Sequence, residues 1–206
     1  MLSVQPWLRF DGKELSRAYL NLSASTSAPG QPGILLISNH RSHLDTFLLL
    51  GRISGVRVLA KRGLFAVPFL GLVMWTSRQI PIRRKSLKSF VEAMDEIGER
   101  LAAGETVHVF PEMTRANADF DGVADFNPGP FLTAMKIGAP ILPLAMLGTS
   151  ETWPKGSFAL RRGANVNVKA LAPIRAEDYS RFLGAKELAE FCRTGIESAY
   201  REGMRA

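Results

Sequence analysis

Cysteine is almost absent from this chain, which has only Cys192 among its 206 residues. A single thiol cannot build an internal disulfide framework, which is typical of a protein kept in a reducing compartment. Long apolar runs are absent too. The longest, residues 64–75, is interrupted by Pro68 and Gly71 and falls short of the roughly 20 residues of a spanning helix. Because the N-terminus also lacks a signal-peptide pattern, we expect a cytoplasmic protein that is soluble or peripheral on a membrane surface.

Signatures of several widespread classes of site are missing as well. The sequence has no Gly-x-x-x-x-Gly-Lys phosphate loop, no Gly-x-Ser-x-Gly nucleophile elbow and no cysteine-based metal pattern. No nucleic-acid-binding module is recognisable either, so we expect no nucleic-acid partner. These absences argue against a P-loop enzyme, an elbow-type serine hydrolase and a structural zinc site.

Acidic residues are missing between Asp45 and Glu92. The same stretch carries nine basic residues, namely Arg52, Arg57, Lys61, Arg62, Arg78, Arg83, Arg84, Lys85 and Lys88. In a chain of net charge +7, this run predicts an anion site or an acidic partner, such as phosphate, an acidic carrier protein or anionic lipid headgroups. The apolar residues 64–75 lie inside the run. They predict either a segment that dips into a bilayer or lines an acyl groove, or a segment buried in the core, and both interpretations remain open.

Strands and helices are expected to alternate from Gly33 onward. Short apolar runs predict strands over 33–38, 56–60, 79–82, 106–110, 141–147 and 166–171. Helices are expected near Asp45 and over 86–103, 131–137 and 186–201, the second of these ending before Gly104. This alternation predicts an α/β fold, a single layered domain with a mostly parallel central sheet flanked by helices.

The predicted domain covers residues 1–206 and has two parts. Residues 1–32 form an N-terminal amphipathic segment and loop, and residues 33–206 form the α/β core that carries the site. Within the first part, some of residues 1–22 are expected to form an amphipathic helix that either lies on a membrane or packs on the core.

Polar side chains of catalytic type follow three of the predicted strands. They are Asn39, His40, His43 and Asp45 after the first, Arg83, Arg84 and Lys85 after the third, and Glu112, Thr114 and Arg115 after the fourth. In open α/β sheets, ligands bind beyond the carboxyl ends of the strands. If these strands are parallel neighbours, the three groups meet in one crevice.

His40 and Asp45 are the candidate catalytic pair. A carboxylate five positions on can fold back to one ring nitrogen of His40, which would leave the other nitrogen as a general base. The alternative is that Asp45 only caps a helix and His40 is a surface residue. A metal site made of His40, His43 and Asp45 is a further alternative, but no additional His or Cys ligand is evident. The remaining histidine, His108, lies in a predicted strand and is expected to be a packed residue.

Four motifs in order resemble those of the glycerolipid acyltransferases, the family of lysophosphatidic acid acyltransferase. Residues 39–45, Asn-His-Arg-Ser-His-Leu-Asp, resemble its His-x-x-x-x-Asp motif. Residues 61–71, with Lys61, Leu64, Pro68 and Gly71, and residues 80–84, Ile-Pro-Ile-Arg-Arg, resemble its second motif. Residues 110–115, Phe-Pro-Glu-Met-Thr-Arg, and 139–144, Ala-Pro-Ile-Leu-Pro-Leu, resemble the third and fourth. Each motif alone is weak, but the ordered set is specific.

The resemblance implies an O-acyltransferase of membrane lipid synthesis. It would move a fatty acyl group from acyl-CoA or acyl carrier protein to a lysophospholipid-type acceptor, foremost 1-acylglycerol 3-phosphate. His40 would be the general base, oriented by Asp45. Arg84 and Arg115 would hold the acceptor's phosphate with help from Lys61, and Glu112 and Thr114 would shape the acceptor site. The resemblance implies no metal and no bound organic cofactor, and an anionic membrane surface as a partner.

The sequence also departs from the family pattern. Met113 stands where the family usually has Gly, so a positive φ at this position would strain the loop. Arg83 stands where Asp is common, Gly63 where Glu is common, and Ala116 where Ser is frequent. The departures leave room for another acceptor, such as lyso-ornithine lipid or glycerol 3-phosphate, or for a non-catalytic relative that binds membranes.

Overall fold

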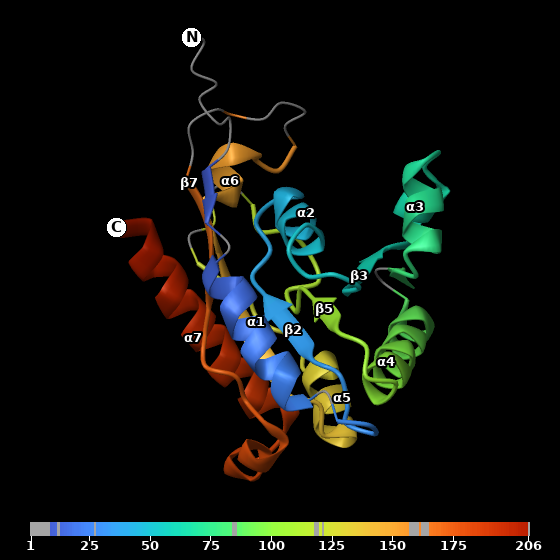
Figure 1. The fold of residues 1–206 in the computed structure, drawn as a ribbon. Helices are drawn as coiled ribbons and strands as arrows, with labels where there is room; N and C mark the ends of the chain where they lie inside the picture. Colours follow the sequence, from blue (N-terminus) through green and yellow to red (C-terminus); the bar gives the residue numbers. More distant parts are fainter. Residues whose placement is uncertain are drawn as a thin grey trace.

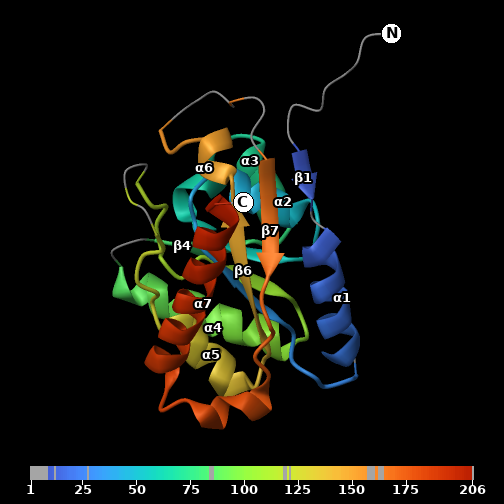
Figure 2. The ribbon, with the colours of Figure 1, turned by 90° about the vertical axis from the view of Figure 1, so that its left-hand side faces the viewer.

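The computed structural model describes residues 9–11, 13–26, 28–83, 86–117, 120, 122–156, 161 and 165–205. These residues form a seven-stranded sheet with helices on both faces (Figures 1 and 2). The strands are β1 (Arg9–Asp11), β2 (Leu35–Ser38), β3 (Arg57–Lys61), β4 (Ile80–Ile82), β5 (Val107–Val109), β6 (Ile141–Leu147) and β7 (Asn165–Ala170). The α-helices are α1 (Lys13–Thr26), α2 (Leu44–Leu50), α3 (Leu70–Thr76), α4 (Leu87–Ala102), α5 (Gly129–Ile137), α6 (Thr149–Thr152) and α7 (Ala185–Arg205). Two 3₁₀ helices, η1 (Arg62–Ala66) and η2 (Ala176–Arg181), complete the set.

The strands lie in the order β1-β7-β6-β2-β5-β3-β4. Every neighbouring pair is parallel except β6 and β7, which run antiparallel. The mostly parallel sheet predicted from the alternation is therefore confirmed. Because β2, β3, β4 and β5 are parallel, their carboxyl ends meet at one edge of the sheet, as the grouping of polar residues required.

Each face of the sheet carries its own apolar core. Leu35 and Ile37 of β2 point into the larger core, which α4, α5 and α7 cover. Leu36, between them, points into a second core covered by α1 and α2. A strand buried on both faces is apolar at every position, which explains the unbroken run at 33–37. Cys192 of α7 is buried in the larger core as a small apolar side chain.

The N-terminal helix differs in length from the prediction. A loop was expected from residue 23, but α1 continues to Thr26. The reason is local, because Ser25 Oγ and Thr26 Oγ1 both donate to Leu22 O. Hydroxyl-rich composition, which is typical of loops, here supplies partners for carbonyl groups at the helix end. Leu15 and Leu22 are buried in the second core, so this helix packs on the sheet.

Three short elements were not predicted, namely β1, α6 and η2. Each spans three to six residues, too few to show a hydrophobic period. The apolar residues 64–75 divide into the end of η1 and most of α3, separated by a turn at residues 67–69. In the described part of the chain, no helix combines the length and apolar content that crossing a membrane requires.

Candidate active site

The site begins where β2 ends, at Asn39. Its side-chain amide exchanges two hydrogen bonds with the backbone of Met146: Nδ2 donates to Met146 O at 3.1 Å, and Met146 N donates to Oδ1 at 2.7 Å. Asn39 thus continues the pairing of β2 with β6 through its side chain. The backbone after Asn39 can therefore leave the sheet at its carboxyl edge and turn toward α2. Asn39 itself is fully buried.

His40 and Asp45 are in direct contact, as their spacing predicted. His40 Nδ1 lies 2.9 Å from Asp45 Oδ2. The His40 ring also stacks on Phe110, at the end of β5, with centroids 3.7 Å apart and planes 15° apart. With Nδ1 donating to the carboxylate, the neutral ring carries its lone pair on Nε2. Ring stacking and the carboxylate together define the direction in which that nitrogen points.

Asp45 also organises the loop that carries His40. Its Oδ2 accepts from the backbone N–H groups of Arg41 and Ser42, each at 2.8 Å. The helix α2 begins after His43, and Asp45 lies inside its first turn, where the helix dipole favours a negative charge. Asp45 is therefore not the capping residue of α2. The carboxylate is completely buried and serves the loop and the histidine instead.

Glu112 supports His40 from the end of the neighbouring strand β5. Its Oε1 accepts from His40 N at 2.7 Å, and its Oε2 accepts from Ala124 N at 3.1 Å. Burial raises the pKa of Glu112 to about 7, while the two N–H donors and Arg41 act in the opposite direction. Glu112 thus joins the loop after β5 to the histidine loop, a contact more specific than its predicted part in shaping an acceptor site.

Arg41 is a site residue that sequence reasoning did not single out. Its guanidinium is buried, donates to Phe120 O at 2.7 Å and to Gly122 O at 3.2 Å, and lies 5.3 Å from the ring centroid of Tyr200 in α7. The residue therefore fastens the loop after β5 to the histidine loop and to the last helix. Its place inside the first motif could have indicated a functional role for Arg41. Its contacts could not be predicted, because the partners are distant in sequence.

Of the other predicted binding residues, Thr114 and Arg115 belong to the segment that follows β5, and Lys61 is the last residue of β3, at the carboxyl edge of the sheet. Thr114 is exposed and Arg115 is half-buried in the loop after β5, and Arg115 is close enough to His43 to help lower its pKa, after the larger effect of burial. Lys155 Nζ donates to Arg115 O at 2.9 Å. Lys61 is exposed at the end of β3. Arg84 lies outside the described residues, so its predicted role stays a prediction.

Met113 has the left-handed backbone that its place in the motif suggested, with φ of 58°. The side chain is half-buried and packs against the larger core. The backbone conformation is one that glycine adopts at no steric cost, whereas a side chain costs about 1 kcal/mol there. The loop keeps the left-handed conformation and accepts this strain.

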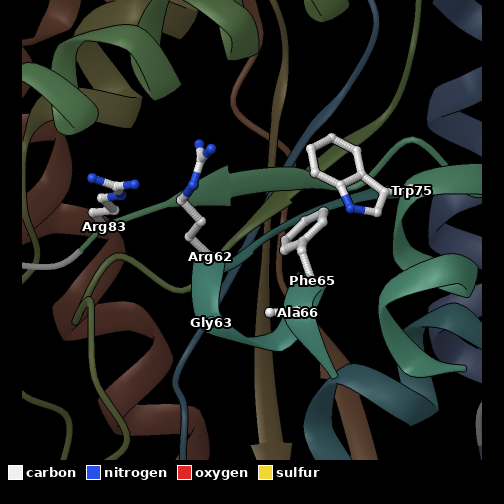
Figure 3. A pocket seen from close by; sticks show the side chains of 6 residues that line it. All are labelled: Arg62, Gly63, Phe65, Ala66, Trp75 and Arg83. Atoms are coloured by element: carbon white, nitrogen blue, oxygen red, sulfur yellow. The ribbon is translucent and has the colours of Figure 1, made fainter. Parts of the chain in front are cut away.

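A pocket of about 430 Å³ lies beside η1 at the same edge of the sheet (Figure 3). It is lined by Arg62, Gly63, Phe65, Ala66, Trp75 and Arg83. In Figure 3 the two guanidinium groups lie on one side and the two aromatic rings on the other. Phe65 and Trp75 meet edge to face with centroids 5.0 Å apart. Such a lining suits a molecule with both an anionic and an apolar part.

The metal alternative finds no cluster in the described part of the chain, where no three His, Cys, Asp or Glu residues are grouped as ligands. His108 is a packed residue, as expected. It is fully buried, its Nε2 lies 3.0 Å from Ser38 Oγ, and burial lowers its pKa to about 3, so that it stays neutral.

Comparisons with known proteins identify the family of this chain. The sequence profile of the acyltransferase family matches residues 10–147. A 1-acyl-sn-glycerol-3-phosphate acyltransferase of Arabidopsis thaliana, LPAT1, chloroplastic, is 33% identical over 139 residues, which are 67% of this chain and 38% of that protein. A protein of the same name from Pseudomonas aeruginosa is 30% identical over 160 residues, 76% of this chain and 61% of that protein. The chain thus spans less than two thirds of the length of these relatives.

A solved structure agrees over more of the chain. The crystal structure of the 1-acyl-sn-glycerophosphate (LPA) acyltransferase PlsC from Thermotoga maritima has a TM-score of 0.74 and 25% identity, and the match covers 95% of this chain and 71% of that one. The family profile covers most of the sequence, and the fold agrees over nearly all of it. The resemblance drawn from the four motifs is confirmed, and the chain belongs to the acyltransferase family.

Proposed function

We propose that this protein moves a fatty acyl group from an acyl thioester, acyl-CoA or acyl carrier protein, to the hydroxyl group of a lysophospholipid-type acceptor in membrane lipid synthesis. The preferred acceptor is 1-acylglycerol 3-phosphate, the molecule in the names of the relatives from Arabidopsis thaliana and Pseudomonas aeruginosa. The observation that carries the proposal is the buried contact of 2.9 Å between His40 Nδ1 and Asp45 Oδ2 within the family's first motif.

The proposed reaction is a direct transfer in two steps. His40 Nε2 takes the proton of the acceptor hydroxyl while that oxygen attacks the thioester carbonyl carbon, giving a tetrahedral intermediate and an imidazolium ring. Asp45 stabilises the imidazolium through Nδ1. The intermediate then expels the thiolate, which takes the proton from His40. The products are the acylated acceptor and a free thiol, and no metal or bound organic cofactor is needed.

Basic residues on the same edge supply binding for the acceptor's phosphate. Arg115 is close enough to His43 to help lower the pKa of that ring, and a guanidinium fork binds phosphate oxygens in pairs. Arg84 and Lys61 are proposed to contribute to the same task, and Thr114 to line the acceptor site. Because such an acceptor is embedded in a bilayer, we also propose that the protein works peripherally on an anionic membrane.

The test is an assay of thiol release from acyl-CoA and from acyl carrier protein. The acceptor panel holds 1-acylglycerol 3-phosphate, glycerol 3-phosphate and lyso-ornithine lipid. Wild type should release thiol only with an acceptor, and His40→Ala should lower turnover by about 10²–10⁴-fold. Arg115→Ala should raise KM for the phosphate acceptor more than KM for the donor. Folded wild type that releases no thiol with any pair would refute the proposal and favour a non-catalytic, membrane-binding relative.

A further inference from the structure

The helix α3 exposes most of its apolar residues. Of its seven residues, only Gly71 and Met74 are buried. The exposed apolar side chains of α3 and the preceding turn form what we call the α3 patch: Val67, Phe69, Leu70, Leu72, Val73 and Trp75. Phe69 is 86% exposed and Leu72 is 65% exposed. Clustered apolar exposure of this kind marks a surface that has a partner.

The backbone before α3 turns Phe69 outward. Phe69 has φ of 60° and ψ of −52°, and Leu70 N donates to Pro68 O at 2.6 Å across it, which makes a three-residue turn. Positive φ at a bulky residue is strained. Because the ring is almost wholly exposed, packing within this chain does not compensate for the strain. Burial of the ring against a partner outside this chain would compensate for the strain.

The patch stands clear of the rest of the molecule. A Cβ at Gly71 would lie 2.1 Å from Phe65 O, so α3 meets η1 through a close backbone contact that only glycine permits. Figure 1 shows α3 at the outer end of the molecule beside β3, separate from the helices that cover the sheet. This contact with η1 leaves the other sides of the helix accessible.

Basic residues border the patch. Lys61, Arg62 and Arg83 are exposed, and within the described part of the chain none of them forms an ion pair with a carboxylate. No acidic residue occurs between Asp45 and Glu92 to offset them. An apolar centre with aromatic side chains and a basic border complements a bilayer that carries anionic headgroups.

We propose that the α3 patch is the surface through which this protein enters an anionic phospholipid bilayer. Phe69 and Leu72 would lie among the acyl chains, and Arg62 and Arg83 would face the headgroup phosphates. The inference rests on the proposed function. It explains how an acceptor leaves the bilayer, because the pocket that Trp75 lines borders the patch and lies at the carboxyl edge of the sheet.

Vesicle binding tests the proposal with a matched control. The double variant Phe69→Asn, Leu72→Gln removes the apolar side chains while Asn tolerates positive φ and Gln favours helix. The control, Leu20→Gln with Leu183→Gln, changes two exposed leucines on α1 and next to α7. On vesicles of phosphatidylcholine with phosphatidylglycerol, the patch variant should partition at least about tenfold more weakly than wild type. The control should bind as wild type does, and binding of wild type should weaken with salt.

A second readout locates the contact. Cys192 is buried, so the introduced thiol of Leu72→Cys can be labelled selectively with an environment-sensitive dye. The dye at residue 72 should shift to the blue on anionic vesicles, and a dye at residue 183 should not. Unchanged partition of the double variant, or no shift at residue 72, would overturn the proposal. So would a wild-type dimer that the double variant converts to monomer without losing vesicle binding, because the patch would then belong to a second copy.

The activity assay separates this proposal from the proposed function. With a short-chain acceptor dispersed as single molecules, the double variant should turn over like wild type. With the acceptor embedded in vesicles, it should be at least about tenfold slower. Wild type that transfers no acyl group to either form would refute the proposed function, and the vesicle-binding result would still decide whether the α3 patch docks.

Discussion

The substitution Asp45→Asn separates the charge of Asp45 from its part in folding the loop. Asp45 Oδ2 accepts from His40 Nδ1, Arg41 N and Ser42 N, whereas Oδ1 is buried without a hydrogen bond. An asparagine can place its carbonyl oxygen at the Oδ2 position and keep all three donors satisfied. Its NH₂ group then takes the unpartnered position, and the negative charge next to the imidazolium is lost. We expect turnover to fall by about 10²–10⁴-fold in a protein that still folds.

The magnitudes set the two effects apart. A fall of 10²–10⁴-fold is about 3–5 kcal/mol in the activation barrier. The buried NH₂ group without an acceptor costs about 1–3 kcal/mol of stability. Asp45→Ala instead leaves three donors unpaired, each at a similar cost, which is a large part of the 5–15 kcal/mol that typically stabilises a domain. Asparagine should therefore mainly lower turnover, and alanine should also strongly destabilise the protein.

The assays are urea unfolding and acceptor-dependent thiol release on the same preparations. The asparagine variant should keep most of the free energy of unfolding, and the alanine variant should lose much of it. An asparagine variant with turnover within a few-fold of wild type would refute the reasoning, because the carboxylate charge would then have no part in the reaction. An asparagine variant as unstable as the alanine variant would show that the amide does not turn its carbonyl oxygen toward the three donors.

Three further predictions concern the loops around the pair. Met113→Gly should change the free energy of unfolding by no more than about 1 kcal/mol and leave turnover intact, because relief of the positive φ offsets the lost packing. A loss of several kcal/mol in urea unfolding would show that packing dominates. Burial raises the pKa of Glu112 from 4.5 to about 7. Between these two pH values the folded protein keeps a proton on Glu112 that the unfolded chain has released. Its stabilising contribution is complete below about pH 4.5 and is lost as pH rises through 7, a decline of about 3 kcal/mol that urea unfolding of Glu112→Gln should not show. Arg41→Met should lower the free energy of unfolding by about 2–4 kcal/mol and also lower turnover, because it removes two hydrogen bonds to the loop after β5. Unchanged melting and kinetics would show that Arg41 does not hold this loop in place.

The sequence predicted the parts of the fold that have a period or an ordered motif. The strands β2 and β6 could be predicted because they are buried at every position and therefore read as apolar runs. The helix α4 could be predicted because its buried residues recur at helical spacing. The meeting of His40 with Asp45 followed from a short spacing next to a strand end. The left-handed backbone of Met113 was one of two reasons that the usual glycine of the motif offered, the other being a close backbone approach.

What could not be predicted depends on contacts between distant segments. β1 is a three-residue strand that exists because β7 lies beside it. The partners of Arg41 come from residues 120 and 122 and from Tyr200 in the last helix, and no local pattern encodes them. The pairing of Asn39 with Met146 is equally remote, since an asparagine before a histidine looks like an ordinary turn residue.

The position of β2 also has a consequence for how the protein acquires its activity. Among the described residues, β2 pairs with β5 and β6, which are synthesised long after it. Loop closure must therefore precede any pairing at the centre of the sheet. The histidine loop depends on the same late segments, through Glu112 and Met146. A nascent or partly refolded chain therefore has no preorganised histidine. In refolding experiments, recovered turnover should report native molecules alone and should lag behind the helical signal of α4, which forms from local contacts.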